Sequence, residues 1–258
     1  MIILQPNKKP APAAVQPAVI TVSDLFRSFG SNHVLNGFDL TLHRGEIVVV
    51  LGRSGSGKSV LIKCIIGLIA PDAGRIEVLG ADISSLSQDA LDQVRAKIGF
   101  LFQSNALYDS MTVRENLEFP LRRHWIQVHQ AELDGLVRAV LQDVGLEHTI
   151  DMMPASLSGG MQKRIALART LMLKPEIILY DEPTAGLDPI TGREIIDLIL
   201  QVRNKYGSSA LIISHDMRCV RLTADRIVLL LDGVAYATGS YQELSASNDS
   251  QIQQFFNS

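Results

Sequence analysis

The stretch that most constrains how this chain can fold is residues 52–59, which read Gly-Arg-Ser-Gly-Ser-Gly-Lys-Ser. They fit the pattern G-x-x-x-x-G-K-[S/T] of a phosphate-binding loop. Residues 47–51 before the loop form an apolar run that predicts a buried strand, and residues 60–66 after it predict a helix. A strand, a glycine-rich loop and a helix in this order predict an α/β fold with a phosphate site between that strand and that helix.

The residue types in the loop suit an anion. Glycines at positions 52, 55 and 57 allow successive backbone N–H groups to surround a phosphate. The helix that follows directs the positive end of its dipole at the same point. We expect Lys58 to neutralise the β- and γ-phosphates of a nucleotide and the Ser59 hydroxyl to bind Mg²⁺. The alternative is a glycine-rich turn that binds no ligand.

The composition excludes some classes of protein. With 258 residues, a net charge of -3 and a pI of about 6.1, the chain can bury a full core and lacks the basic character of a general nucleic-acid binder. Its two cysteines, Cys64 and Cys219, lack metal-ligand spacing and are expected to be reduced, buried thiols. The mean hydropathy of +0.17 indicates either a surface covered by a partner or a well-filled core.

The N-terminal residues are not expected to fold or to direct the chain to a membrane. Residues 1–17 are rich in proline, and their short apolar start precedes Lys8 and Lys9, which is the wrong order for a signal peptide. No apolar run approaches the roughly 18 residues that span a bilayer. We therefore expect a flexible N-terminal tail.

Apolar patterns predict the elements of the first half of the chain. The predicted strands are residues 18–22, 25–26, 38–42, 75–80 and 98–102. The predicted helices are residues 86–97, 113–121 and 130–144. Phe29 could stack on a nucleobase or belong to the core, and Gln103 could bind Mg²⁺ or water or be a polar strand end. Residues 122–125 are interpreted as a solvated loop, with a partner contact as the alternative.

Residues 157–161, Leu-Ser-Gly-Gly-Met, open a helix in an unusual way. Ser158 is a good N-cap for a helix at residues 161–173. Two adjacent glycines are costly at a helix start. We therefore interpret Gly159 and Gly160 as allowing the backbone to approach an anion closely.

Charged residues follow two further predicted strands. Residues 176–180 are an apolar strand ending in Asp181 and Glu182, and residues 210–214 are a strand followed by His215. In an open parallel sheet, ligands bind beyond the carboxyl ends of the strands. We expect Asp181 to hold Mg²⁺ through water, Glu182 to orient and deprotonate the attacking water, and His215 to contact the γ-phosphate. An acidic loop and a structural histidine are the alternatives.

The remaining predicted elements complete the chain. Residues 190–204 are a helix, residues 226–239 a hairpin, and residues 241–258 a short helix and a tail.

These motifs, in this order, resemble those of the ATP-binding-cassette (ABC) ATPases over roughly residues 18–245. The resemblance implies a P-loop NTPase fold, with a RecA-like core, an antiparallel β subdomain and a helical subdomain at about residues 104–170. It implies tails at residues 1–17 and 246–258. The residues that it assigns to ATP are Phe29, Gly52, Arg53, Ser54, Gly55, Ser56, Gly57, Lys58, Ser59, Val60 and Gln103.

The resemblance also implies the chemistry of the site. It assigns catalysis to Lys58, Glu182 and His215. It places Mg²⁺ on Ser59, Gln103 and Asp181, and Asp188 in the D-loop.

Residues 157–161 resemble the family signature, although the commonest signature ends in Gln, and Met161 stands here with Gln162 next. In the family this motif faces the γ-phosphate held by the other subunit. The resemblance therefore implies a homodimer in which Ser158, Gly159, Gly160 and Met161 act in trans, closing on ATP and opening after hydrolysis.

Longer segments resemble the cassettes of the Mla lipid transporters, which work with MCE-domain proteins: residues 102–121, 158–164, 181–191 and 252–256. This narrower resemblance implies an ATPase peripheral to the cytoplasmic face of a bacterial inner membrane. It would move phospholipids between inner and outer membranes and maintain outer-membrane lipid asymmetry. The implied partners are an integral membrane permease, an MCE-domain protein and a small STAS-domain regulator.

Two other functions stay open. One is the ATPase of an importer for another small solute, such as an amino acid. The other is a soluble cassette acting on DNA or ribosomes, which is disfavoured because the 100 residues from Lys58 to Ser158 leave no room for a coiled-coil insertion.

Overall fold

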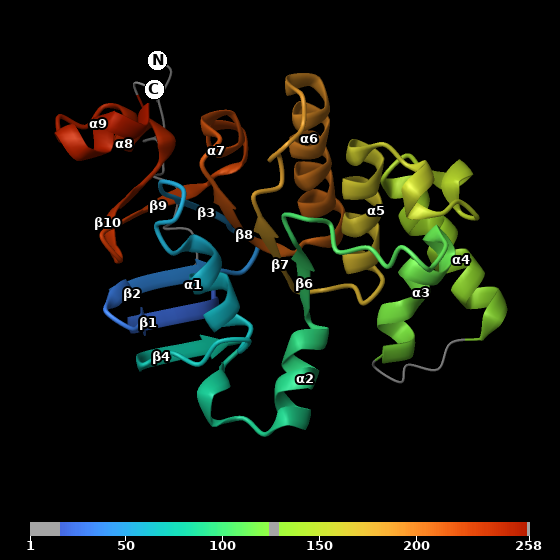
Figure 1. The fold of residues 1–258 in the computed structure, drawn as a ribbon, viewed down its shortest axis with the longest axis horizontal. Helices are drawn as coiled ribbons and strands as arrows, with labels where there is room; N and C mark the ends of the chain where they lie inside the picture. Colours follow the sequence, from blue (N-terminus) through green and yellow to red (C-terminus); the bar gives the residue numbers. More distant parts are fainter. Residues whose placement is uncertain (1–15, 124–128, 257–258) are drawn as a thin grey trace, which may run out of the picture.

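The computed structural model describes residues 16–123 and 129–256. Most of the predicted N-terminal tail, together with His124 and Trp125 of the predicted solvated loop, lies outside the described residues. Two sheets organise the chain, and Figure 1 shows the smaller sheet beside α1 at one end of the molecule and helices α3 and α4 at the other end.

A six-stranded sheet with the order β10-β9-β3-β8-β7-β6 forms the centre of the fold. Its strands are β3 (Ile47–Leu51), β6 (Ile98–Leu101), β7 (Ile177–Asp181), β8 (Ser209–Ser214), β9 (Arg226–Leu231) and β10 (Val234–Gly239). Neighbouring strands pair in parallel except β9 and β10, which form the predicted hairpin. β3, β7 and β8 are buried along their whole length, which explains their continuous apolar sequences.

The second sheet is antiparallel and has the order β2-β1-β4-β5. Its strands are β1 (Ala18–Phe29), β2 (Asn32–His43), β4 (Ala73–Val78) and β5 (Ala81–Asp82). The strand predicted at residues 75–80 is displaced towards the N-terminus, because Leu79 and Gly80 have φ angles of 51° and 80° and form a turn. The predicted strands at residues 18–22 and 25–26 are parts of one long strand, β1.

The predicted helices occur with shifted ends, and the structure adds two that were not predicted. The helices are α1 (Lys58–Ile65), α2 (Gln88–Ala96), α3 (Val113–Arg123), α4 (Gln130–Asp143), α5 (Gly159–Leu171), α6 (Pro189–Tyr206), α7 (Met217–Thr223), α8 (Tyr241–Ser245) and α9 (Ser250–Phe256), of which α7 and α9 are the additional two. Short 3₁₀ turns lie at Ile83–Ser85, Glu147–Thr149 and Pro154–Ser156. α3, α4 and α5 pack against one another, in the region of the helical subdomain predicted at about residues 104–170.

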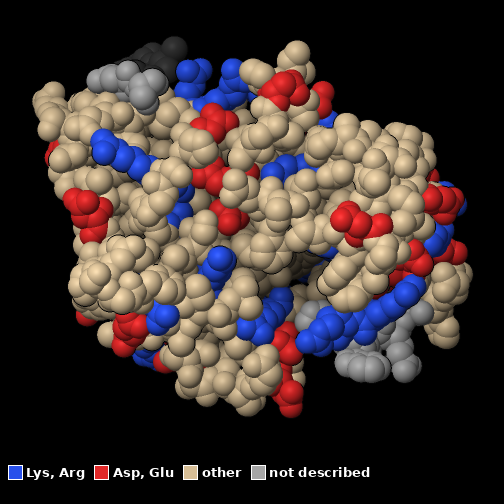
Figure 2. Space-filling model, in the orientation of Figure 1, with Lys and Arg blue, Asp and Glu red and all other residues tan. Residues whose placement is uncertain are grey.

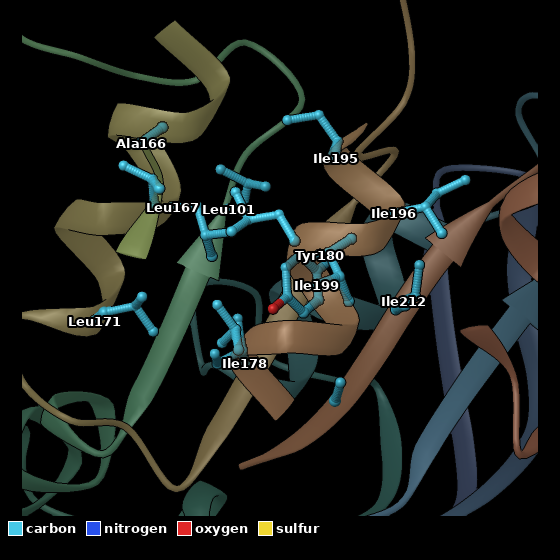
Figure 3. Close-up of a cluster of buried hydrophobic side chains, with 14 of the residues drawn as sticks. Leu101, Ala166, Leu167, Leu171, Ile178, Tyr180, Ile195, Ile196, Ile199 and Ile212 are labelled. Carbon is cyan, nitrogen blue, oxygen red and sulfur yellow. The ribbon is translucent and has the colours of Figure 1, made fainter. Parts of the chain in front are cut away.

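Alternate residues of the central strands pack into two hydrophobic cores. Val48 and Leu179 face one core, which includes residues of α1 and of the antiparallel sheet. Val49 and Ile178 face the other core, which includes residues of α5 and α6. Figure 3 shows side chains of this second core, in which α5 and α6 pack onto β6, β7 and β8: Leu101, Ala166, Leu167, Leu171, Ile178, Tyr180, Ile195, Ile196, Ile199 and Ile212.

The tail predicted at residues 246–258 is wrong over Ser250–Phe256, which form α9. Ile252 and Phe255 are only 7% and 9% exposed and belong to the core. The rings of Phe256 and Tyr241 lie 5.3 Å apart and join α9 to α8. The spacing of these apolar residues is the helical i, i+3, i+4 pattern, which was the available signal.

The surface charges and the two cysteines have the properties expected from the composition. On the face shown in Figure 2, acidic and basic side chains are interspersed. Across the described ranges, no helix is both long and apolar enough to cross a bilayer. Cys64 and Cys219 are buried free thiols, and burial raises their pKa to about 11 and about 12, so both stay protonated near neutral pH.

One buried polar side chain fixes the loop that leads into α3. Asn116 is fully buried, and its Oδ1 accepts a hydrogen bond from the Tyr108 N–H at 2.8 Å. Its Nδ2 donates to the carbonyls of Tyr108, Met111 and Thr112 at 3.0–3.1 Å. The amide thus supplies both the acceptor and the donor that this irregular backbone needs.

We expect Asn116→Asp to lower the free energy of unfolding by about 1–3 kcal/mol, because a carboxylate leaves buried carbonyls without a donor. Urea unfolding measures the change. Asn204→Asp, at an exposed position of α6, is the matched control and should change stability by less than roughly 0.5 kcal/mol. Equal small effects at both positions would contradict the role of Asn116.

Candidate functional site

The parallel strands bring the predicted site residues to one edge of the central sheet. Leu51 of β3 pairs with Ser214 of β8, and Ile213 of β8 pairs with Asp181 of β7. The loops that follow these three strands therefore lie side by side. This is the edge at which open α/β sheets bind ligands.

Two glycines of the phosphate loop are required by the surrounding chain. A Cβ at Gly52 would lie 2.7 Å from Oγ of Ser56 and 2.9 Å from the carbonyl oxygen of Leu230. Gly57 has a φ of 102°, and a Cβ there would lie 2.6 Å from Cγ1 of Val34. Because α1 begins at the next residue, the loop presents its backbone at a helix N-terminus, where anions bind.

Lys58 is held inside the phosphate loop. Its Nζ donates to the carbonyls of Gly52 and Arg53 at 2.8 and 2.9 Å. The same atom lies 3.7 Å from Oε1 of Glu182. Burial lowers the pKa of Lys58, while the carboxylates of Glu182 and Asp181 act in the opposite direction. The ammonium group is therefore positioned between the loop and an acidic pair.

Ser59 and Asp181 form a second contact. The Ser59 hydroxyl donates to Oδ1 of Asp181 at 3.3 Å. Burial raises the pKa of Asp181, and the hydrogen bond from Ser59 partly opposes that shift. Hydroxyl and carboxylate oxygens are the kind of ligand that Mg²⁺ takes together with substrate phosphates. Within the described residues, no group of three His, Cys, Asp or Glu side chains could hold a metal ion.

Glu182 is constrained by its backbone and by His215. Its φ of 48° is in the left-handed region, which non-glycine residues adopt rarely. Its Oε2 accepts a hydrogen bond from the backbone N–H of His215 at 3.3 Å, and its Oε1 lies 2.9 Å from Nδ1 of the same residue. The Glu182 side chain is 11% exposed and the His215 side chain 61% exposed. A buried carboxylate therefore connects Lys58 with an accessible imidazole.

Gln103 contacts the residues around the site through its backbone carbonyl. Its carbonyl oxygen accepts a hydrogen bond from Nζ of Lys163 at 3.0 Å, and the residue itself is exposed. Within the part of the chain that the structure describes, its amide group makes no hydrogen bond to Ser59 or Asp181. The structure thus unites Ser59 with Asp181 and leaves the Gln103 side chain outside that pair.

The two signature glycines have different surroundings. Oγ of Ser158 accepts a hydrogen bond from the Met161 N–H at 3.3 Å and caps α5, as predicted. No atom lies within 4 Å of a Cβ placed at Gly159. A Cβ at Gly160 would lie 2.5 Å from Cγ2 of Thr191. The interpretation of both glycines as anion contacts is therefore incomplete, because Gly160 is also needed where α5 packs against α6.

Two further predicted residues lie at the surface. Phe29, at the end of β1, is 47% exposed, so the alternative that it belongs to the core is wrong. The guanidinium carbon of Arg27 lies 4.7 Å from the centroid of the Phe29 ring. Asp188 caps α6 by accepting hydrogen bonds from the N–H groups of Ile190 and Thr191 at 3.0 and 3.1 Å.

Several residues around the site were missed from the sequence. Lys163 is only 2% exposed, and burial lowers its pKa while Asp181 and Glu182 oppose that shift. It shares the helical i, i+4, i+8 spacing with the buried Leu167 and Leu171. A lysine on an apolar face was the signal that could have found it.

Another missed contact joins the phosphate loop to the C-terminal helix. The Arg53 guanidinium donates a hydrogen bond to Oε1 of Gln254 in α9. It also lies 5.9 Å from the centroid of the Phe255 ring. Since α9 was predicted to be a tail, no sequence pattern pointed to this contact.

Comparison with known proteins identifies the family. The sequence model of the ABC transporter family matches residues 35–185. The chain is 37% identical over 243 residues to the methionine import ATP-binding protein MetN of Brucella abortus (strain 2308), covering 94% of this chain and 65% of that protein. The chain thus spans slightly less than two thirds of the length of that relative.

Two other comparisons cover more of the related chains. The chain is 38% identical over 237 residues to the intermembrane phospholipid transport system ATP-binding protein MlaF of Escherichia coli (strain K12), covering 92% of this chain and 88% of that one. The dimeric structure of MJ0796, a bacterial ABC transporter cassette, matches with a TM-score of 0.79 and 31% identity over 86% of this chain and 98% of that chain. The fold, the strand-edge site and these relatives agree, and the chain therefore belongs to the ABC transporter family as an ABC-type ATPase domain.

Proposed function

We propose that this chain is the ATP-hydrolysing subunit of a transporter that moves phospholipids between membranes. The observation that carries the ATPase assignment is the contact of one buried carboxylate, Glu182, with both Lys58 and His215 at the edge where the phosphate loop lies. The relatives that carry the transport assignment are named as a phospholipid transport ATPase and a methionine import ATPase.

In the proposed mechanism, different residues at the strand edge bind the phosphates of the substrate ATP, orient the attacking water and accept its proton. The backbone of the phosphate loop and the Lys58 ammonium bind its phosphates. Glu182 orients the attacking water and accepts its proton. His215 contacts the γ-phosphate side of the site and holds Glu182 in place through the 2.9 Å contact. The left-handed backbone at Glu182 fixes the carboxylate before substrate arrives.

Ser59 and Asp181 are the residues that would hold Mg²⁺, with Gln103 as a further ligand. The ion would neutralise charge on the phosphates. Phe29 offers an exposed ring for the adenine.

The site is proposed to be completed by a second copy of the chain. Ser158 and Gly159 lie at the exposed start of α5, and the space around Gly159 is open in its own chain. The neighbouring Ile190, at the start of α6, is 75% exposed. A partner subunit bound here would cover this apolar side chain and receive Ser158, Gly159 and Met161 at its nucleotide. The related cassette MJ0796 is a dimer in its solved structure.

The transport partners are proposed to be a membrane permease, an MCE-domain protein and a STAS-domain regulator. A cavity of about 500 Å³ opens between β6, α3 and α5, with Phe100, Phe102, Tyr108 and Phe119 among its lining residues. Because Arg95, Arg123 and Arg169 also line it, the cavity suits a permease segment that presents both apolar and acidic side chains. The chain would then lie on the cytoplasmic face of the inner membrane.

The cargo is tested by isolating the intact complex from membranes and identifying bound molecules by mass spectrometry. We expect phospholipid, because the related MlaF serves phospholipid transport. Bound methionine or another amino acid, without lipid, would support the second candidate, an amino-acid importer, which the similarity to MetN favours.

We expect Glu182→Gln to lower kcat for ATP hydrolysis by about 10²–10⁴-fold, because an amide cannot accept the proton of water. ATP binding should persist and the dimer should accumulate, which size-exclusion chromatography with ATP and Mg²⁺ measures. Glu132→Gln, at an exposed position of α4, is the matched control and should behave like the wild type. Full ATPase activity in the Glu182 variant would remove the catalytic assignment.

The signature glycines should respond differently to alanine. Gly159→Ala should keep or raise the thermal stability, because alanine favours a helix, and should weaken ATP-driven dimerisation. Gly160→Ala should lower stability by about 1–3 kcal/mol, because its Cβ meets Thr191. Adding Thr191→Ser, which removes the clashing methyl group, should restore stability. Normal dimerisation of the Gly159 variant would refute its contact with the partner.

A further inference from the structure

The segment after β6, residues 103–106, is an irregular stretch whose local backbone hydrogen bonds run from the Asn105 N–H to the Phe102 carbonyl at 3.1 Å and from the Ala106 N–H to the Ser104 carbonyl at 2.7 Å. Asn105 and Ala106 have φ angles of 62° and 51°, in the left-handed region. Non-glycine residues in this conformation cost on the order of 1 kcal/mol or more each. The Oδ1 atom of Asn105 is buried without a hydrogen-bond partner in the described chain. Contacts from outside the segment add to its local turns in holding residues 103–106, which begin with Gln103.

Two cations of α5 provide this support. Nζ of Lys163 donates to the carbonyl of Gln103 at 3.0 Å. The Arg169 guanidinium donates through Nη1 to the carbonyl of Ala106 at 2.8 Å and through Nη2 to that of Asn105 at 3.2 Å. The two cations are six residues apart, about 9 Å along the helix. Side chains of α5 thus donate hydrogen bonds to both ends of the segment.

The two cations differ in their exposure to water, because Lys163 is buried while the bond from Arg169 to the Ala106 carbonyl is exposed. Lys163 is 2% exposed, and Asp181 and Glu182 are the carboxylates that act on its charge. Arg169 lies with its guanidinium carbon 5.9 Å from the centroid of the Tyr108 ring, which follows the segment. Hydrogen bonds from charged donors contribute about 1.5–3 kcal/mol each, enough to offset the strain of the segment.

We infer that Lys163 and Arg169 are positioning residues that make α5 and residues 103–106 move as one body. The N-terminus of the same helix carries Ser158 and Gly159, which the proposed function places at the partner's nucleotide. The position of Gln103 at its own site is then set by what α5 contacts in the partner. We call the hydrogen bonds from Lys163 and Arg169 to residues 103–106 the clamp. The clamp is a property of one chain, whereas its effect on the partner's nucleotide site rests on the proposed function.

The test uses the full-length protein with Lys163→Met, Lys163→Arg and Arg169→Lys. Lys163→Met keeps the unbranched apolar stem and removes the donor, and Lys163→Arg retains a charged donor. Arg169→Lys replaces the planar guanidinium, which donates through two separate nitrogens, by a shorter side chain with a single nitrogen. Lys174→Met, at an exposed position just after α5, is the matched control. Amide hydrogen exchange at Asn105 and Ala106, ATP affinity, kcat and KM are measured for each variant, and thermal unfolding confirms that each is folded.

We expect Lys163→Met and Arg169→Lys to speed exchange at residues 105–106 by at least tenfold. For Lys163→Met, kcat should fall at least tenfold with ATP affinity within twofold, because the phosphate loop is untouched, and Lys163→Arg should recover most of the loss. Unchanged exchange overturns the clamp. Faster exchange with unchanged kcat, or faster exchange throughout the chain, also overturns the inference, because the cations would then only stabilise the fold.

The two proposals fail separately. A wild-type protein that neither binds nor hydrolyses ATP would refute the proposed function. The exchange measurements on residues 105–106 would still decide the clamp, since they need no nucleotide.

Discussion

The parallel pairing of β7, β8 and β3 is the constraint on which the site depends. Its register places the end of each strand beside the next, so that Asp181 and the phosphate loop meet at one edge of the sheet. A slip of one residue would turn every side chain of the slipped strand to the opposite face of the sheet. The two cores on either side of the sheet, which contain different residues of the same strands, prevent such a slip.

Charges buried at this edge balance one another. Burial favours the neutral forms of Lys58, Lys163 and Asp181, while opposite charges within the cluster favour the charged forms. Removing one member therefore leaves its neighbours as buried charges without full compensation. The cluster is best understood as a unit in which the left-handed backbone of Glu182 sets the geometry.

The sequence predicted the fold and the strand-edge residues because both depend on local patterns. Continuous apolar runs gave β3, β7 and β8, and polar residues at their ends gave Asp181 and Glu182. Other features depend on elements that meet only in the folded chain. These are the close approach of Gly160 to Thr191 and the hydrogen bonds from Arg169 to the carbonyls of residues 105 and 106. α9 was missed because a short amphipathic helix gains its stability from docking and not from its own sequence.

The contact between Arg53 and Gln254 joins the phosphate loop to the C-terminal helix. Thermodynamic coupling between two sites is reciprocal. If a ligand binds Arg53 and breaks its contact with Gln254, the binding of the ligand weakens the docking of α9, and the docking of α9 weakens ligand binding by the same free energy. Such a ligand would couple occupancy of the phosphate loop to the docking of α9 through the Arg53 guanidinium. A probe attached near residue 254 would report on nucleotide occupancy from outside the pocket.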